Sequence, residues 1–286
     1  MPFVIQILLL VAGLAALLAF LWWLINLTEG TYLGRRVVVW LYDISAWRYD
    51  NLKGFEPLLE QRYLAWPLMR HLGRNTAPLV LDVATGTGRV PRALLGAPGF
   101  NGRIVALDPS RRMLAQGVPH LAEDLAAERV YLVQQPARPL PFPDDCFDLV
   151  TCLEALEFLP RPRAAVAEFV RVTRPGGLLL LTNRRGRDAK FMPGKAWPRE
   201  RALRIYQDEF GLQAVRWEPW QADYDLIWAT KPGHSPPRRA RPLPEIWCCP
   251  RCAHIALENH PAGYACDACG CTVRHQDGIL TPRCKA

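Results

Sequence analysis

The sequence predicts an α/β fold built on a doubly wound, mostly parallel sheet. Three features of the 286 residues support this prediction and extend it. Short apolar runs alternate with helical patterns between residues 78 and 230, which is typical of strands joined by crossover helices. An uncharged N-terminal stretch predicts a transmembrane helix in front of the sheet. Two closely spaced cysteine pairs near the C-terminus predict a small metal-binding domain behind it.

Composition limits the classes of protein that remain. Half of the residues are hydrophobic and 22% are charged, which excludes a disordered or collagen-like chain. The formal net charge is +8, and this favours an anionic partner such as nucleic acid or a lipid surface without choosing between them. Nine cysteines are too few for a disulfide scaffold in a chain of this length.

The first 27 residues contain no Asp, Glu, Lys or Arg, and Gln6 is the one polar side chain in residues 3–25. About 20 apolar residues span the hydrocarbon core of a bilayer, and Trp22 and Trp23 lie where indole rings favour the interface. A cleaved signal peptide would need a basic start and a shorter apolar core, and a buried core helix is rarely so uniformly apolar. Arg35 and Arg36 follow the apolar stretch, so the positive-inside rule predicts a cytoplasmic location for the rest of the chain.

The strands and helices are expected in alternation. Apolar runs predict strands at residues 79–84, 103–107, 130–134, 147–153, 178–182 and 225–230. Helical patterns follow Gly88, with Pro91 in the first turn, and cover residues 111–127 and 163–172. Ligands of such sheets bind at the carboxyl ends of the strands, so the loop after the first strand is the candidate ligand site.

That loop contains Gly86 and Gly88, which allow close approach of a ligand to the backbone and lead into a helix N-terminus. Pro91 stands where a dinucleotide fingerprint needs Gly or Ala, and the loop has no Walker lysine. Asp82, on the strand itself, suits an ammonium group better than a pyrophosphate.

Four segments in order resemble the motifs of class I S-adenosylmethionine-dependent methyltransferases, whose fold is Rossmann-like. They are Leu-Asp-Val-Ala-Thr-Gly-Thr-Gly at 81–88, Val-Ala-Leu-Asp-Pro-Ser at 105–110, Leu-Pro-Phe-Pro-Asp-Asp at 140–145, and Arg-Val-Thr-Arg-Pro-Gly-Gly at 171–177. The resemblance is greatest to ubiquinone and menaquinone C-methyltransferases. It implies S-adenosylmethionine as cofactor, with Asp108 on the ribose hydroxyls. The implied cofactor-binding residues are Asp82, Ala84, Thr85, Gly86, Gly88, Asp108, Pro109, Pro136 and Ala137.

The sequence departs from this family in three places. Ala84 replaces the usual first glycine of the loop, and Pro136 stands where an acid normally pairs with the adenine amine. After the fourth strand the family often has Glu-His, whereas this chain has Glu157 and Phe158. The adenine would then depend on backbone groups and apolar contacts, and one candidate base is missing.

The acceptor site is less defined, because methyl transfer depends mainly on positioning and needs a base only if the acceptor must lose a proton. The candidates are Tyr42, Asp43, Glu154 and Glu157. Tyr42 could equally be an interfacial aromatic near the membrane. The absence of an Asn-Pro-Pro motif after the fourth strand counts against methylation of an adenine or glutamine amide nitrogen.

A basic insert and a proline-rich linker follow the fifth strand. Residues 184–204 carry an excess of six positive charges with interleaved apolar side chains. A solvated helix face, a substrate lid, contact with anionic headgroups and contact with RNA all remain open for this insert. Residues 232–244 contain five prolines and form a stiff linker.

The C-terminal region predicts a structural zinc site. Cys249, Cys252, Cys266 and Cys269 form two Cys-x-x-Cys pairs separated by thirteen residues, which is enough chain for a hairpin that joins them. Disulfides would conflict with a cytoplasmic location. Cys248 and Cys271 are adjacent spare cysteines, and Cys284 is expected to be a bystander. The region resembles the small zinc-ribbon proteins that activate methyltransferases, which implies a ribbon fused to its own catalytic domain.

The sequence thus predicts four units: a transmembrane anchor at 1–27, a methyltransferase domain at 28–231, the linker at 232–244, and a zinc ribbon at 245–286. The favoured function is a membrane-tethered methyltransferase that acts on a small amphiphilic acceptor, quinone-like or lipid-like. The alternative is a methyltransferase that acts on RNA or protein recognised through the ribbon. A degenerate scaffold is a third interpretation, supported by Pro136 alone.

Overall fold

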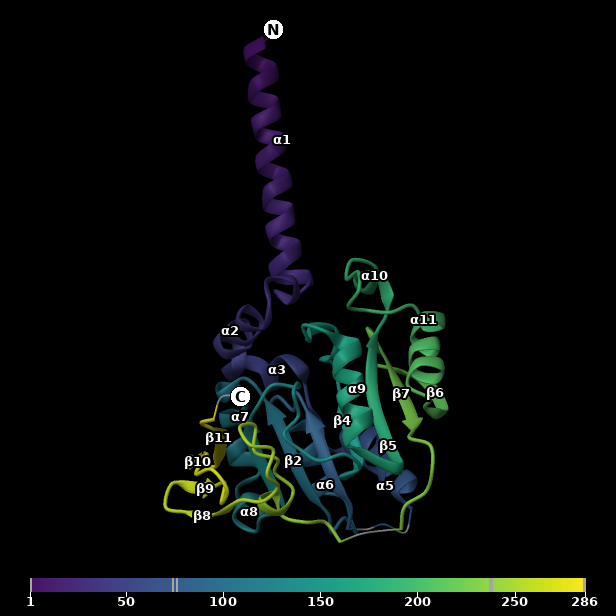
Figure 1. The fold of residues 1–286 in the computed structure, drawn as a ribbon. Helices are drawn as coiled ribbons and strands as arrows, with labels where there is room; N and C mark the ends of the chain where they lie inside the picture. Colours follow the sequence, from purple (N-terminus) through teal and green to yellow (C-terminus); the bar gives the residue numbers. More distant parts are fainter. Residues whose placement is uncertain (1, 74, 76, 237–238, 285–286) are drawn as a thin grey trace.

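The computed structural model describes residues 2–73, 75, 77–236 and 239–284; of the predicted linker, residues 237 and 238 lie outside this range. Its centre is one mixed sheet with the strand order β6-β7-β5-β4-β1-β2-β3-β11-β10-β9-β8 (Figure 1). The strands are β1 (Leu79–Val83), β2 (Arg103–Asp108), β3 (Val130–Gln134), β4 (Phe147–Cys152), β5 (Thr173–Arg184), β6 (Gln213–Trp220), β7 (Tyr224–Thr230), β8 (Glu258–His260), β9 (Gly263–Ala265), β10 (Thr272–Gln276) and β11 (Ile279–Pro282).

The helices surround this sheet and precede it. They are α1 (Pro2–Trp22), α2 (Arg35–Ser45), α3 (Tyr49–Lys53), α4 (Pro57–Glu60), α5 (Trp66–Leu72), α6 (Arg89–Leu95), α7 (Arg111–Gly117), α8 (Ala122–Ala126), α9 (Pro162–Val172), α10 (Gly186–Lys190) and α11 (Arg199–Arg204). Shorter helical turns are η1 (Trp23–Leu27), η2 (Thr31–Leu33), η3 (Ala46–Arg48), η4 (Gln61–Ala65), η5 (Val118–His120), η6 (Leu156–Phe158), η7 (Ile205–Glu209) and η8 (Leu243–Glu245).

The predicted parallel sheet is confirmed over its central five strands. β3, β2, β1, β4 and β5 are parallel, as continuous apolar runs covered on both faces require. Every residue of β1 is buried, with Leu81 and Val83 in the apolar core on one face and Val80 in the core on the other. β7 and β6 add antiparallel strands beyond β5. β6 was not expected from the sequence, because its alternating, largely exposed residues lack an apolar run.

The predicted helix at 111–127 is wrong in one respect. The structure breaks it into α7, η5 and α8 around Pro119, which lacks an N–H and disfavours helical geometry in the residue before it. Gly117 ends α7 where its backbone lies against the glycine loop: a Cβ there would lie 2.8 Å from the Thr87 carbonyl oxygen.

The C-terminal hairpins continue the sheet. β11 pairs in parallel with β3, through Ile279 with Leu132 and Leu280 with Val133. The sequence left open whether this tail contacts the catalytic domain. Without the tail, β3 would be an edge strand with unpaired backbone N–H and C=O groups, and only the folded structure shows that β11 pairs with them. Leu280 and Cys266 belong to the same apolar core as β1.

The N-terminal helix stands apart from the rest. Residues Phe3–Leu27 form a segment that is long and apolar enough to cross a membrane. The side chains of its first twenty described residues, 3–22, are exposed, and Leu24 near its end is buried against the chain. In Figure 1, α1 projects away from the sheet, with α2 just beyond its end and α10 at a similar level.

Candidate functional site

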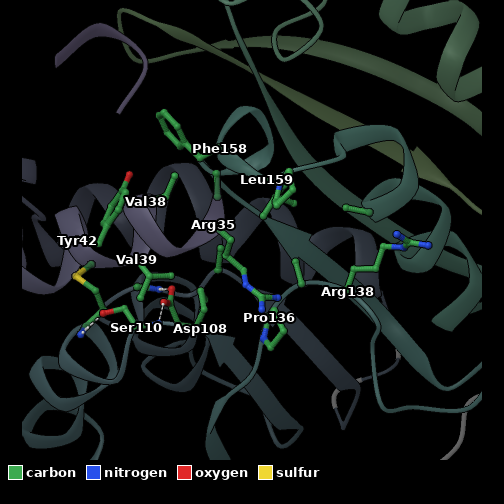
Figure 2. Close-up of a pocket in the computed structure, with 18 of the residues that line it drawn as sticks. Arg35, Val38, Val39, Tyr42, Asp108, Ser110, Pro136, Arg138, Phe158 and Leu159 are labelled. Carbon is green, nitrogen blue, oxygen red and sulfur yellow. Dashed lines mark hydrogen bonds between the residues drawn. The ribbon is translucent and has the colours of Figure 1, made fainter. Parts of the chain in front are cut away.

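A cavity of about 480 Å³ opens at the carboxyl ends of the central strands, where the topology predicts a ligand. Its volume lies in the range of small-molecule sites. Of the residues proposed from the sequence, the structure brings together along its wall Tyr42, Ala84, Gly86, Asp108, Pro109, Pro136, Ala137 and Glu154. The described residues that line the cavity do not include five others proposed from the sequence: Asp43, Asp82, Thr85, Gly88 and Glu157. α2 and the segment after β4 complete the wall (Figure 2).

The glycine loop has the backbone shape that its sequence predicts. Ala84, Gly86 and Gly88 all have positive φ, of 57°, 59° and 89°. A side chain at Gly86 would meet the Met113 methyl group at 3.3 Å, so glycine keeps the backbone open to the cavity there. Ala84 adopts a left-handed conformation that is unfavourable for a residue with a Cβ, and this is the place where the family usually has glycine.

Asp108 lies at the floor of the cavity and is held by backbone groups. Its Oδ2 accepts a hydrogen bond from the Gly86 N–H at 3.0 Å, and its Oδ1 accepts one from the Ser110 N–H at 2.8 Å. A carboxylate has about four acceptor positions, so two remain for ribose hydroxyls. Burial raises the pKa of Asp108 to about 6, although the two N–H groups oppose this shift. The residues present therefore fit S-adenosylmethionine.

The raised pKa of Asp108 predicts a pH dependence of cofactor binding. The ionised carboxylate accepts ribose hydroxyls, and protonation removes that capacity. Affinity should therefore be constant above about pH 7 and fall by up to about tenfold per pH unit below pH 6. Titration calorimetry with S-adenosylhomocysteine from pH 8 to pH 5 measures this. The matched control is Asp108→Asn, which should bind more weakly at pH 8 and show no such fall; a fall in both proteins would contradict the assignment.

Asp82 supports the loop from below and does not face the cavity. It is 2% exposed, and it accepts a hydrogen bond from the Thr151 hydroxyl at 2.6 Å. Burial raises its pKa to about 7. This arrangement fits a role in holding β1 to β4 under the glycine loop.

Asp43 and Tyr42, both on α2, connect this helix to the turn after β2 and to the segment before α2. The Ser110 hydroxyl donates to Asp43 at 2.5 Å, which fixes α2 beside the turn after β2. The Tyr42 hydroxyl lines the cavity and donates to Glu29 at 2.7 Å. Burial, with the neighbouring Glu29 carboxylate, raises the pKa of Tyr42 well above its usual value, so the hydroxyl stays protonated. Nothing in the sequence pointed to Glu29, which lies in no motif and stands between η1 and η2.

Glu154 forms ion pairs with two cations. Lys53 contacts it at 2.5 Å and Arg89 at 2.6 Å, while its side chain is 6% exposed. Its backbone N–H also donates to the Thr182 hydroxyl, at 2.6 Å. Because Lys53 belongs to α3 and Arg89 to α6, Glu154 ties together the helices that enclose the cavity.

Glu157 lies behind the cavity wall in a separate buried cluster. It accepts a hydrogen bond from the Tyr224 hydroxyl at 2.6 Å, and Arg184 lies 3.8 Å away. Burial raises the pKa of Glu157. The cavity-facing position after it is Phe158, so the wall here is apolar.

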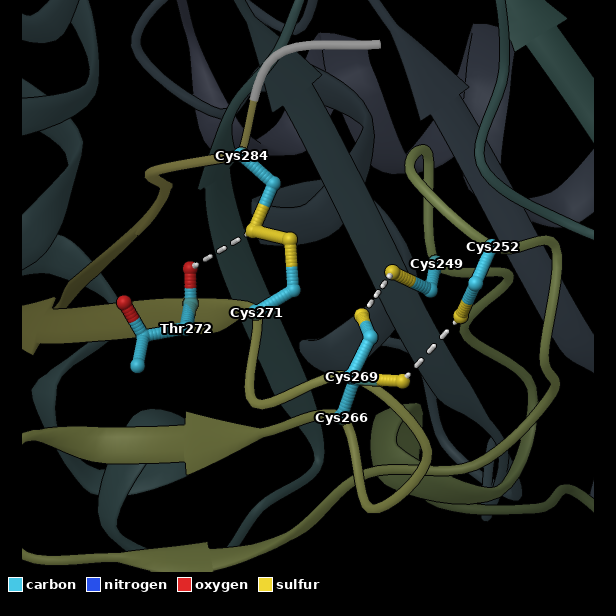
Figure 3. Close-up of a disulfide and its surroundings, with 7 residues drawn as sticks. All are labelled: Cys249, Cys252, Cys266, Cys269, Cys271, Thr272 and Cys284. Atoms are coloured by element: carbon cyan, nitrogen blue, oxygen red, sulfur yellow. Dashed lines mark hydrogen bonds between the residues drawn. A yellow bond between two sulfur atoms is a disulfide. The ribbon is translucent and has the colours of Figure 1, made fainter.

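The four predicted metal ligands converge in the C-terminal region (Figure 3). The sulfur atoms of Cys249, Cys252, Cys266 and Cys269 all lie within 4.8 Å of one another. Two of the sulfur pairs are 3.5 and 3.6 Å apart, close to the roughly 3.8 Å that a tetrahedron of 2.3 Å Zn–S bonds requires. The donor set therefore fits a zinc ion.

The remaining cysteines of this region are arranged differently from the expectation. Cys271 and Cys284 are joined as a disulfide, with Cα atoms 5.7 Å apart, and connect the segment before β10 to the segment after β11. Cys284 is thus not a bystander in the structure, because the β10–β11 hairpin brings it opposite Cys271. Cys248 lies outside the four-sulfur cluster.

Comparison with known proteins agrees with the central part of this geometry. Residues 81–181 match the family model described as a methyltransferase domain. The chain is 38% identical over 102 residues to the ubiquinone/menaquinone biosynthesis C-methyltransferase of Stutzerimonas stutzeri, covering 36% of this chain and 40% of that protein. It is 33% identical over 140 residues to the demethylmenaquinone methyltransferase of Lactiplantibacillus plantarum, covering 49% and 59%. The chain thus spans about half the length of these relatives.

Solved structures share the fold. The [4+2]-cyclase SpnF aligns with a TM-score of 0.55 at 20% identity, over 68% of this chain and 95% of its own. A complex of the Haloferax volcanii Trm112 methyltransferase activator with a putative methyltransferase aligns with a TM-score of 0.53 at 19% identity, over 68% and 97%. These solved structures show the fold alone. The family model and the methyltransferase relatives confirm the predicted S-adenosylmethionine-dependent methyltransferase domain over residues 81–181.

Proposed function

We propose that this protein transfers a methyl group from S-adenosylmethionine to a small amphiphilic acceptor, quinone-like or lipid-like, that it takes from a membrane. The observation that carries the proposal is the composition of one cavity. Its floor presents Asp108 and the glycine loop, while α2 and the segment after β4 give it apolar walls that include Val38, Val39 and Phe158. Relatives that match the methyltransferase domain are named for quinone methylation, which supports the acceptor class.

The cofactor would supply a methyl group on a sulfonium, and this chain would supply position and a dry cavity. Asp108 would hold the ribose, and the backbone at Gly86 would leave room for the cofactor. Tyr42 would keep its proton and present a fixed hydroxyl beside the acceptor. The walls would exclude water, and orientation of the acceptor toward the methyl group would provide much of the rate.

The tether is the second part of the proposal. α1 would cross the bilayer, and Arg35 and Arg36 would place the catalytic domain in the cytoplasm. The segment after α1 contacts the domain directly, since the Thr31 hydroxyl in η2 donates to the Glu157 carbonyl at 3.1 Å. In the reducing cytoplasm Cys271 and Cys284 would be a pair of thiols, and the four-cysteine cluster would be free to bind zinc.

The zinc ribbon is proposed as a built-in support for the cofactor site. Arg111, three residues after Asp108, forms an ion pair with Asp277 at 3.0 Å and donates to the Gln276 carbonyl. The Thr281 hydroxyl donates to Gln134 at 3.3 Å at the end of β3. These contacts, together with the β3–β11 pairing, would hold the turn after β2 in place.

Methyl incorporation from labelled cofactor tests the acceptor class. Membranes and total RNA from cells that lack the gene would be incubated with the full-length protein or with Asp108→Ala. We expect label in the lipid extract, dependent on Asp108 and insensitive to salt. Label in RNA, with binding that falls by orders of magnitude between about 50 and 200 mM salt, would instead support the nucleic-acid alternative.

A further inference from the structure

Helix α2 has two opposite faces with different surroundings. Arg35, Val38, Val39 and Tyr42 line the cavity. Trp40, Ile44 and Trp47, spaced by four and three residues and thus aligned along one side of the helix and its continuation into η3, face outward. They are 57%, 46% and 69% exposed. We call these three residues the outer face of α2.

The outer face is unusual for a surface in contact with water. Two tryptophans and an isoleucine lie exposed along one side of the helix, and the Arg48 guanidinium lies over the Trp47 ring at 5.1 Å. Tryptophan beside arginine on one side of a helix is the chemistry of a membrane interface, where the ring enters the acyl boundary and the cation meets the headgroups.

The segment that joins α1 to α2 contacts the insert after β5. The Trp23 indole N–H donates to the Phe191 carbonyl at 3.1 Å, and the Tyr32 hydroxyl donates to the Pro193 carbonyl at 2.8 Å. The rings of Trp23 and Tyr32 stack on each other with centroids 5.2 Å apart. The segment that joins α1 to α2 is therefore held against the domain. Figure 1 shows α2 between the end of α1 and the remainder of the domain.

The same level of the molecule carries a second exposed apolar side chain and several cations. Phe191, at the end of α10, is 56% exposed and lies beside Trp23. The exposed cations on α2, η3 and α10 are Arg35, Arg36, Arg48, Arg187 and Lys190. Clustered cations next to a membrane span attract anionic lipids.

We propose that the outer face of α2, together with Phe191, lies in the headgroup region of an anionic bilayer. The inference rests on the proposed membrane tether. α2 is then a wall one helix thick, with lipid on its outer face and the methyl-transfer cavity on its inner face. An acceptor whose reacting group lies at headgroup depth reaches the cavity around this helix without crossing water.

Quenching of tryptophan fluorescence by brominated lipid tests this placement in the full-length protein. The protein would be reconstituted into nanodiscs of phosphatidylcholine with phosphatidylglycerol, with or without bromine near the headgroup end of the acyl chains. Trp22, Trp23, Trp40 and Trp47 should be quenched. The double variant Trp40→Phe/Trp47→Phe should lose about half of the quenched intensity, because two of four interfacial tryptophans are removed.

Trp66→Phe is the matched control. Trp66 is 58% exposed, close to the 57% of Trp40, but lies on α5, which Figure 1 places at the far end of the domain from α1. The control should keep the full quenched intensity. Replacing phosphatidylglycerol with phosphatidylcholine should reduce the quenching that Trp40 and Trp47 contribute.

The possible failures are distinguishable. Unchanged quenching in the Trp40/Trp47 variant, with loss of quenching in Trp22→Phe/Trp23→Phe, would overturn this inference and leave the tether intact. Absence of quenching in the unmodified protein would overturn both. Equal loss in the Trp66 variant would show non-specific contact with lipid and would also reject the proposal.

Discussion

Replacement of Asp108 by alanine should weaken binding of S-adenosylmethionine by well over tenfold. Asp108 is 8% exposed, and its two backbone hydrogen bonds, from Gly86 and Ser110, aim its free acceptor positions into the cavity. Loss of two ribose hydrogen bonds, in part charge-assisted, should cost about 2–4 kcal/mol. Each 1.4 kcal/mol corresponds to a factor of about ten in the dissociation constant.

Calorimetry with purified full-length protein in detergent measures the effect of this change. Asp223→Ala is the control, since Asp223 is an exposed aspartate in the turn between β6 and β7. The control should bind the cofactor as the unmodified protein does. Unchanged affinity in Asp108→Ala, with a thermal unfolding curve like that of the unmodified protein, would refute the assignment of Asp108 to the ribose.

The second large effect concerns the metal. Metal analysis of the unmodified protein should find one zinc per chain, and the double variant Cys266→Ser/Cys269→Ser should contain none. Four thiolates within 4.8 Å of one another form a closed tetrahedral set, and the removal of two leaves too few ligands. Zinc binding of this kind supplies about 10–16 kcal/mol to the folding of small domains. The variant should therefore unfold its C-terminal hairpins.

The loss of zinc should also weaken cofactor binding. Unfolded hairpins would remove β11 from β3 and release Arg111 from Asp277. We expect weaker cofactor binding in the double variant. Cys248→Ser should keep the zinc content and the cofactor affinity of the unmodified protein, because its sulfur lies outside the cluster. Full metal content in the double variant, or less than half an equivalent in the unmodified protein after protection from chelators, would contradict the site.

The cofactor half of the cavity could be predicted residue by residue, because local backbone geometry fixes it. A strand, a turn with glycines at positive φ and an acid at the end of the next strand are adjacent in sequence or one crossover apart, so Gly86 and Asp108 meet in any parallel sheet of this order. The acceptor half could not be predicted. Glu29 meets Tyr42, and Lys53 meets Glu154, only after the N-terminal segment folds over the sheet, and no spacing in the sequence encodes these contacts.

The sequence by itself determined the methyltransferase domain at residues 81–181, the central parallel sheet, an apolar N-terminal segment of membrane-spanning length and the four cysteines that converge. Each depends on short-range patterns: hydrophobic periodicity, turn residues and ligand spacing. The tertiary structure alone decided that β11 joins the sheet at β3, that Glu154 is held by two cations, and that Cys271 meets Cys284. It also decided that α2 separates the cavity from an exposed tryptophan face. These features depend on which edges, charges and surfaces become neighbours when distant segments pack, and such contacts leave no periodic pattern along the chain.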